Sequence, residues 1–203
     1  MKNGHQHRFQ DTEIDSSLFS CPGGLQTNWD VLTGAPCSGK TTLLKLFAEA
    51  GFQTLEEVGR RHIASELAKG RTLAELRGNE AVFQRTLLDL RLEREHGLNP
   101  VNAAFLDRGL PDSLTFYRAN GLDPNEILAE CLHYRYASVF LLDRLPLEMN
   151  GVRSEDDAVS EFIDEWLFRD YTALGYDVER VPVLPIKERL TFILERIPKK
   201  GIA

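Results

Sequence analysis

A glycine-rich segment near the start of the chain has the residue types and the spacing that bind a chain of phosphate groups. Residues 34–41 read Gly-Ala-Pro-Cys-Ser-Gly-Lys-Thr, which matches the pattern Gly-x-x-x-x-Gly-Lys-Ser/Thr. A loop with glycines can aim several backbone N–H groups at phosphate oxygens, and a helix that begins there adds its positive dipole end. The residues expected to contact a nucleotide here are Gly34, Ala35, Pro36, Cys37, Ser38, Gly39, Lys40, Thr41 and Thr42.

The side chains in this segment have separate expected roles. Lys40 is a cation for the β and γ phosphates of a nucleoside triphosphate. The Thr41 hydroxyl is expected to bind Mg²⁺, which prefers oxygen ligands and retains several waters, whereas Thr42 is expected to be structural. Cys37 has two interpretations: a small residue that fills a tight turn, or a reactive thiol whose pKa a helix N-terminus lowers. The segment therefore predicts a site for ATP or another nucleoside triphosphate with Mg²⁺.

Two Asp-Arg pairs follow apolar runs farther along the chain. Asp107-Arg108 follows residues 103–106, and Asp143-Arg144 follows residues 139–142. Phosphate sites lie at the carboxyl ends of parallel strands, so both pairs are expected at one crevice. We expect Asp107 to bind Mg²⁺ through water or to orient an attacking hydroxyl, and Arg108 to hold the acceptor or a phosphate. The pair at 143–144 stays open as a rival, and either pair could instead be a salt-bridged strand end.

Short apolar runs alternate with helical patterns from residue 29 onward, which is typical of βα units winding a parallel sheet. The predicted strands are residues 29–33, 52–56, 103–106, 139–142 and 178–181. The first predicted helix carries Leu43, Leu44 and Phe47 and ends at Gly51. Later helices are predicted over residues 79–96, from 123 to about 134, from 154–157 to 175, and over 187–197.

The composition is that of a globular protein. A length of 203 residues fits one domain, and 42% hydrophobic and 27% charged residues exclude collagen, coiled coil and wholesale disorder. A net charge of −7 argues against a nucleic-acid polymer as partner. The three cysteines have no Cys-x-x-Cys spacing, and no run is long and apolar enough to span a membrane. We expect a cytoplasmic protein.

The first part of the chain differs from the rest. Residues 1–28 mix polar residues with a Pro-Gly-Gly turn and show no sustained periodicity, so they are interpreted as a flexible, partly disordered N-terminal arm. His5 and His7 are interpreted as tail residues without a metal-binding role. Residues 29–203 are interpreted as a single kinase-like nucleotide-binding domain.

Three stretches together resemble a known family. Residues 34–42, the Asp107-Arg108-Gly109 run with Asp112, and the Gly-Val-Arg-Ser-Glu-Asp run at 151–156 are similar to the small predicted ATPases described as an AAA domain. That family is akin to the nicotinamide riboside kinase domain and, more distantly, to nucleoside monophosphate and deoxynucleoside kinases. The resemblance implies a three-layer P-loop sandwich of α/β class, with a parallel five-stranded sheet of order 2-3-1-4-5 and a helical lid. Cys37, where glycine is usual, is a departure that bears on loop rigidity.

The resemblance also assigns further residues. It places a closing lid at residues 148–157, with Arg153 neutralising charge on the transferring phosphoryl group. The run from Glu57 to Arg60 is similar to a Glu-aromatic-Gly-Arg run of the riboside kinase, so Glu57, Arg60 and Arg61 would line the acceptor side; the two arginines equally suit an exposed helical face. The adenine would pack on Leu184 and Pro185, a stretch that equally suits a plain strand-to-helix connection.

These observations favour one function and leave rivals. Motifs typical of GTPases, ABC ATPases and AAA+ machines are absent from the sequence. The first hypothesis is a Mg²⁺-dependent phosphotransferase or ATPase that uses ATP or another nucleoside triphosphate and acts on a small hydroxyl or phosphate acceptor, such as a nucleoside or nucleotide. The second is a nucleotide-dependent switch with slow hydrolysis and a macromolecular partner. A third is a catalytically weak nucleotide-binding protein.

Overall fold

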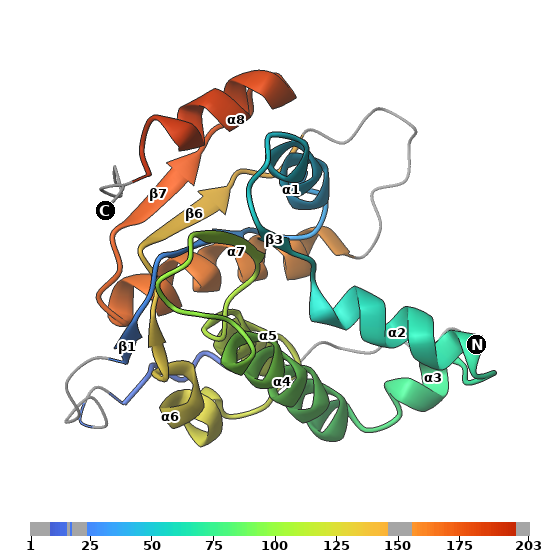
Figure 1. Cartoon of the computed structure of the whole chain (residues 1–203). Coiled ribbons are helices and arrows are strands. Elements are labelled where there is room, and N and C mark those ends of the chain that lie inside the picture. Colours follow the sequence, from blue (N-terminus) through green and yellow to red (C-terminus); the bar gives the residue numbers. More distant parts are fainter. Residues whose placement is uncertain (1–8, 16, 18–23, 146–155, 198–203) are drawn as a thin grey trace.

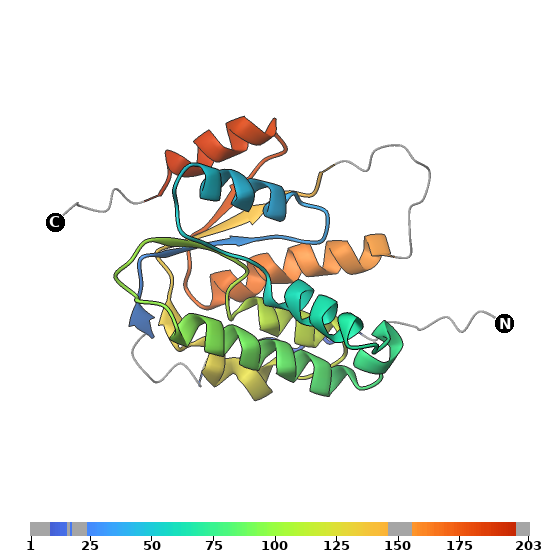
Figure 2. The same ribbon diagram turned by 45° about the vertical axis from the view of Figure 1, so that its right-hand side comes forward.

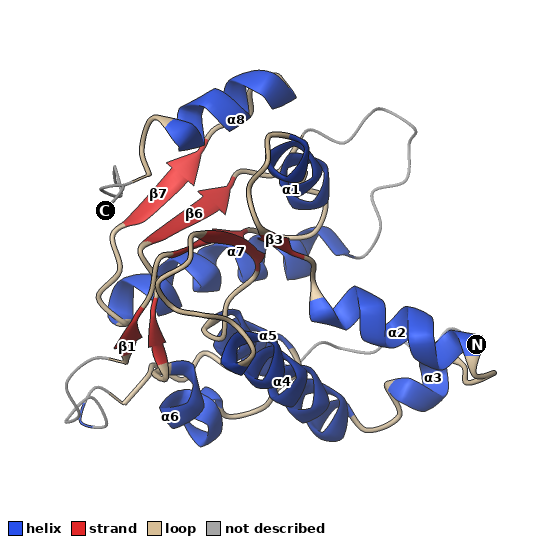
Figure 3. Cartoon of the chain, in the orientation of Figure 1, coloured by secondary structure: helices blue, strands red, loops and turns tan. Residues whose placement is uncertain are grey.

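The computed structural model describes residues 9–15, 17, 24–145 and 156–197. Its main sheet has five parallel strands, and helices and strands alternate along the chain around it (Figures 1 and 3). Across the sheet the order is β3 (Thr54–Leu55), β4 (Ala104–Asp107), β2 (Trp29–Thr33), β6 (Ser138–Leu142) and β7 (Val178–Val181). In strand numbers of the main sheet alone this is 2-3-1-4-5, so the predicted topology is confirmed.

Helices cover both faces of the sheet, which makes three layers (Figure 2). On one face lie α1 (Lys40–Glu49) and α8 (Ile186–Leu194). The other face carries α4 (Glu80–His96), α5 (Asp112–Ala119) and α7 (Asp156–Ala173). None of these helices, nor any other helix in the described part of the chain, is long and apolar enough to cross a membrane.

The strand sequences fix which residues enter each layer. Neighbouring strand residues point to opposite faces, and both faces are covered, so the central strands β2, β4 and β6 are mostly apolar. Leu32, Phe105 and Phe140 pack under α1 and α8. Their chain neighbours Val31 and Leu106 belong to the larger apolar cluster on the opposite face. Two separate cores therefore hold β2, β4 and β6, the strands that precede the candidate site residues.

Several predicted boundaries need correction. The predicted strand at 52–56 is shortened to Thr54–Leu55. The helix predicted from 123 to about 134 begins as expected, with the Asp123 side chain accepting from Asn125 N at 2.9 Å. It is a 3₁₀ turn (Pro124–Ile127) followed by α6 (Leu128–Cys131), and it ends early because Tyr134 belongs to a strand.

Some elements were not predicted. These are α2 (Val58–Ala68), α3 (Leu73–Leu76), α5, and a small parallel sheet of β1 (Leu25–Gln26) and β5 (Tyr134–Arg135). The α5 stretch hides its amphipathicity because its polar residues are buried: Arg118 Nη2 donates to Asp170 Oδ1 at 3.0 Å inside the core. A charged residue at an inward position breaks the apolar spacing that predicts helices.

The described parts of the N-terminal segment contact the domain. The Phe9 ring stacks on Phe162 with centroids 4.3 Å apart, and Gln10 N donates to Arg118 O at 3.0 Å. Asp15 N donates to Asn125 Oδ1 at 2.9 Å. These contacts come from single side chains and backbone groups, which no periodicity in the sequence reveals.

Candidate nucleotide-binding site

The glycine-rich segment forms a tight loop between β2 and α1. Three of its residues have positive φ: Gly34 at 145°, Cys37 at 61° and Gly39 at 87°. A Cβ at Gly34 would lie 2.7 Å from the carbonyl oxygen of Leu142, so only glycine fits between the two strands there. Cys37 adopts a left-handed conformation that disfavours a side chain, and its thiol is exposed. The loop departs from glycine at this position at a cost in backbone strain.

Lys40 is folded back onto the loop. Its Nζ donates to Gly34 O at 2.7 Å, Ala35 O at 2.9 Å and Ser38 Oγ at 2.9 Å. Burial, together with the nearby Arg108 cation, lowers the pKa of Lys40 to about 7, although nearby carboxylates act in the opposite direction. A phosphate chain bound at the loop would compete with these three acceptors for the Lys40 ammonium group.

An arginine on α8 stabilises the loop by donating to one of its backbone carbonyl oxygens. Arg189, on α8, is buried, and its Nη1 donates to Ser38 O at 2.6 Å. Its Nη2 donates to Asp143 O at 2.8 Å and its Nε to Pro182 O at 2.8 Å. One side chain thus joins the loop to the segments that follow β6 and β7. In the sequence, Arg189 is visible only as a charged residue on an amphipathic helix.

Asp107, at the end of β4, suits a hydrated Mg²⁺. It is 2% exposed, and its Oδ1 is buried with no hydrogen-bond partner among the described residues. Burial raises the pKa of Asp107, against the opposing effect of Arg108. An unpartnered buried carboxylate oxygen is satisfied by a cation or its water. No cluster of three or more His, Cys, Asp or Glu in the described ranges could hold a metal alone. The residues present therefore fit a magnesium ion, which would take its other ligands from water, Thr41 and nucleotide oxygens.

Arg108 is held in place by two carboxylates. Its Nε donates to Glu57 Oε1 at 3.0 Å and its Nη1 to Asp112 Oδ1 at 2.9 Å. The guanidinium lies over the Phe116 ring, 4.7 Å from the centroid. Arg108 has a φ of 65°, a second left-handed non-glycine residue beside the site. Among the described residues, the hydrogen bonds of this guanidinium come from Nε and Nη1.

Asp112 and Arg94 organise this corner from within the core. Asp112 accepts from Thr33 Oγ1 at 2.6 Å, from Tyr171 OH at 2.6 Å and from Gly109 N at 3.0 Å. Arg94, on α4, donates to the carbonyl oxygens that flank the site.

Those carbonyl contacts are Asp107 O at 3.1 Å and Arg108 O at 2.7 Å, with Glu56 O at 3.1 Å. The contacts of Arg94 with these carbonyl oxygens, and those of Asp112 with Thr33 and Tyr171, are not predictable from the sequence, because the partners are distant along the chain. The family resemblance included Asp112 but gave it no role. In the structure, its carboxylate accepts from Arg108 and orients that guanidinium.

A cavity of about 510 Å³ lies at the loop. Its lining residues are Pro36, Cys37, Ser38, Gly39, Lys40, Thr41, Thr42, Glu57, Arg60, Arg108 and Phe116. A second cavity of about 570 Å³ lies between α2, α4, α5 and α7 and shares Glu57, Arg60 and Phe116 with the first. The two cavities are therefore neighbours, and Glu57 stands on their common border.

Glu57 is the residue at the N-cap position of α2, and its side chain makes no capping hydrogen bond. Burial raises the pKa of Glu57, but the Arg108, Arg91 and Lys40 cations lower it by more than burial raises it. The net pKa is therefore below the ordinary value. The side chain is therefore an ionised hydrogen-bond acceptor at neutral pH. Glu57, Arg60 and Arg108 line the loop cavity, and Asp107 lies close enough to Lys40 to act on its charge, whereas Arg61 lines a separate groove between α2 and α4.

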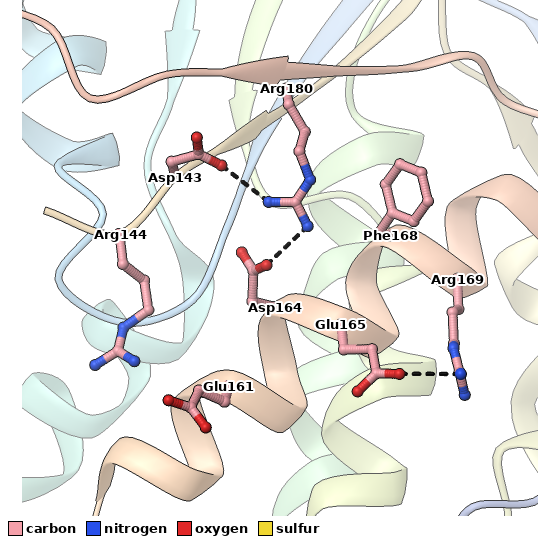
Figure 4. Close-up of a pocket in the computed structure, with 8 residues that line it drawn as sticks. All are labelled: Asp143, Arg144, Glu161, Asp164, Glu165, Phe168, Arg169 and Arg180. Atoms are coloured by element: carbon pink, nitrogen blue, oxygen red, sulfur yellow. Dashed lines mark hydrogen bonds and ion pairs between the residues drawn. The ribbon is translucent and has the colours of Figure 1, made fainter.

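The rival pair lies on another surface. Arg180 donates to Asp143 Oδ1 at 2.9 Å and to Asp164 Oδ2 at 2.8 Å, and both bonds are drawn in Figure 4. Arg144 donates to Asp157 Oδ1 at 2.7 Å. Asp143 and Arg144 line a cavity of about 550 Å³ with five other charged residues and Phe168 (Figure 4), and this cavity shares no lining residue with the loop cavity. They are strand-end ion pairs here.

Two other expectations differ in standing. Leu184 and Pro185 lie between β7 and α8, and neither is among the residues that line the loop cavity. Their contact with adenine stays a prediction. Arg153 and most of the expected lid lie outside the described residues.

The fold and this loop define a P-loop NTPase, a class of nucleotide-binding proteins. A family model described as AAA domain matches residues 30–189, and the chain belongs to that family. No curated protein matches the sequence at a significant level.

Solved structures share the fold at low identity. Thymidylate kinase from Ehrlichia chaffeensis has a TM-score of 0.60 at 14% identity, over 86% of this chain and 98% of that one. Deoxyadenosine kinase from M. mycoides, with dCMP and dCDP bound, has a TM-score of 0.56 at 16% identity, over 83% and 97%. The NadR protein in complex with NR has a TM-score of 0.62 at 16% identity, over 86% of this chain and 52% of NadR. This chain thus spans about half of NadR, and it is distantly similar in structure to nucleoside and nucleotide kinases.

Proposed function

We propose that the protein is a Mg²⁺-dependent phosphotransferase that moves the γ-phosphoryl group of ATP, or another nucleoside triphosphate, to a small hydroxyl or phosphate acceptor. The observation that carries the proposal is the pair of neighbouring cavities. A pure NTP-hydrolysing switch needs only the cavity at the loop. A second cavity of about 570 Å³, which shares Glu57, Arg60 and Phe116 with the first, has the size of a small-molecule site and the position of an acceptor.

The chain's own residues have distinct parts in this transfer. The loop N–H groups and Lys40 hold the β and γ phosphates, and Lys40 exchanges its contacts with Gly34 and Ala35 for phosphate oxygens. Glu57 accepts a hydrogen bond from the acceptor and aims its attacking oxygen at the γ phosphorus. Arg108, fixed by Asp112, offers Nη2 to the transferring group.

Asp107 and Thr41 would hold the magnesium ion, which neutralises charge between the β and γ phosphates when it is bound. The geometry of Asp107 supports this assignment over Asp143, because the Asp143 carboxylate is engaged by Arg180 on the surface. Arg153 belongs to the proposal as a further cation for the phosphoryl group. ATP is abundant in the cytoplasm, and the thiols of Cys37 and Cys131 are free, which supports a cytoplasmic location.

Turnover in the presence of candidate acceptors tests the proposal. ATP consumption with Mg²⁺ is measured alone and with panels of nucleosides, nucleotides and other small hydroxyl compounds. An acceptor that raises the rate at least about tenfold, together with a phosphorylated product, supports phosphotransfer. Unchanged rates with every small molecule, and stimulation by a macromolecule, would favour the nucleotide-dependent switch instead.

A further inference from the structure

The second cavity is positively charged inside an acidic protein. The chain has a net charge of −7, yet the ionisable residues that line this cavity are Arg60, Arg77, Arg91 and the single carboxylate Glu57. Arg77 is paired with Glu80 outside the cavity, and Glu57 is engaged by Arg108. Across the described ranges, no carboxylate forms an ion pair with Arg60 or Arg91, so these two cations of the cavity lack a directly paired carboxylate, although Asp112 and Glu57 act on Arg91 from beyond ion-pair distance.

Of these two arginines, Arg91 is the buried one, and its hydrogen bonds are incomplete. It lies on α4, is 2% exposed, and donates from Nη1 to the Ser113 hydroxyl at 2.7 Å. Its Nε is buried with no hydrogen-bond partner in the described part of the chain. The guanidinium lies 6.0 Å from the Phe116 centroid, beside the border between the two cavities.

A purely structural arginine would be expected to look different. Burying a cation without a carboxylate is costly, and buried charges are therefore normally paired or hydrogen-bonded at most of their donors. Arg118 follows this rule in the same protein, because it forms a buried ion pair with Asp170. Arg91, equally buried, has a neutral hydroxyl as its one hydrogen-bond partner among the described residues, and it lines an open cavity.

We infer that the acceptor carries a phosphate group, which Arg91 and Arg60 bind in the second cavity. A phosphate dianion matches two cations and the several donors of a guanidinium. The rest of the acceptor is an apolar or aromatic body, because Ile63, Phe83, Leu87 and other apolar side chains line the same cavity. This inference rests on the proposed function, and it selects a phosphorylated acceptor over an uncharged hydroxyl compound.

Calorimetry with matched probes tests the inference. The full chain is saturated with a non-hydrolysable ATP analogue and Mg²⁺, so that the loop is filled, and is then titrated with common nucleosides and with their 5′-monophosphates. At least one monophosphate is expected to bind about tenfold or more tightly than its nucleoside. The inference is wrong if none does.

Variants then locate the contact. Arg91→Met is expected to lower the preference for the monophosphate about tenfold while leaving the unfolding temperature unchanged or higher, because a buried cation without a directly paired carboxylate is removed. Arg60→Met, at an exposed position, gives a second reading that does not depend on the folding of the first. Arg85→Met is the matched control: it removes the same charge from α4, but Arg85 is paired with Asp89 and Glu130 outside the cavity.

The outcomes separate the two proposals. A lower unfolding temperature in Arg91→Met with the monophosphate preference intact would make this arginine structural and overturn the inference. Nucleosides that bind and accelerate ATP consumption as well as their monophosphates would overturn it too, while leaving phosphotransfer in place. If the unmodified chain does not bind the ATP analogue, the proposed function is wrong, and the inference that rests on it is wrong too.

Discussion

Arg189 and Ser38 are 151 positions apart in the sequence, yet the guanidinium of one donates to the backbone carbonyl of the other at 2.6 Å. The last described helix therefore supports the first functional loop. Because Arg189 is buried, the contact gives the Ser38 carbonyl oxygen a donor from within the core.

Replacing Arg189 should harm both the fold and the site. Arg189→Met leaves three carbonyl oxygens, those of Ser38, Asp143 and Pro182, without their donor. We expect the free energy of unfolding to fall by about 3 kcal/mol and the Kd of an ATP analogue to rise roughly tenfold. Chemical denaturation and calorimetry measure the two effects. Lys187→Met, an exposed position on the same helix, is the control, and equal Kd values for the two variants would contradict the supporting role.

Lys40→Ala should separate binding from stability. The affinity for an ATP analogue is expected to fall about 100-fold, because a charge-assisted contact to the phosphates is lost. The free energy of unfolding is expected to change by no more than about 1 kcal/mol, since the lost hydrogen bonds are offset by the removal of a buried cation. Lys45→Ala, exposed on the same helix, controls for charge. Unchanged affinity in Lys40→Ala would remove the assignment of the loop.

Asp107→Asn and Asp143→Asn compare the two acidic positions directly. Asp107→Asn should lower Mg²⁺-dependent turnover about 100-fold and should spare nucleotide binding without metal. Because burial raises the pKa of Asp107, the neutral amide should leave the metal-free fold at least as stable. Asp143→Asn removes one surface ion pair with Arg180 and should leave turnover unchanged. The reverse pattern of turnover would move the magnesium site to the rival pair.

Glu95 should make stability depend on pH. Burial raises the pKa of Glu95 above its unfolded value, against the effects of Arg94 and Tyr136. The folded state therefore holds this proton more tightly, so the contribution of Glu95 to stability is greatest below its unfolded pKa and declines as the pH rises through that value toward the folded pKa. Glu95→Gln should flatten this decline, whereas Arg118→Gln, another buried polar change, should not. Denaturation curves from acidic to neutral pH that are parallel for the unmodified chain and Glu95→Gln would be inconsistent with this sign.

Arg153 is tested by kinetics. If it contacts the transferring phosphoryl group, Arg153→Ala should lower turnover about 100-fold and leave the affinity for a nucleoside diphosphate nearly unchanged, because the contact counts mainly in the transition state. Arg144→Ala serves as the comparison, since Arg144 is ion-paired with Asp157. Equal turnover in the two variants would exclude this role for Arg153.

The sheet and the loop were predictable from the sequence, whereas the network around the loop was not. The strand boundaries predicted at 29–33 and 178–181 agree with the structure. Asp107 was predictable because it directly follows the apolar run at 103–106. Arg189 and Arg91 were not, because a buried arginine and an exposed one look alike on a helix until the tertiary partners are known.

Gly109, which follows Asp107 and Arg108 in the chain, packs against two tyrosines of the core. A Cβ at this position would lie 2.9 Å from ring atoms of Tyr136 and 2.9 Å from the Tyr171 hydroxyl. Packing against these two tyrosines therefore explains why position 109 is a glycine. Across related chains, a larger residue at 109 should occur together with smaller residues at 136 or 171, so covariation among these positions would report on the shape of the core and say nothing about the substrate.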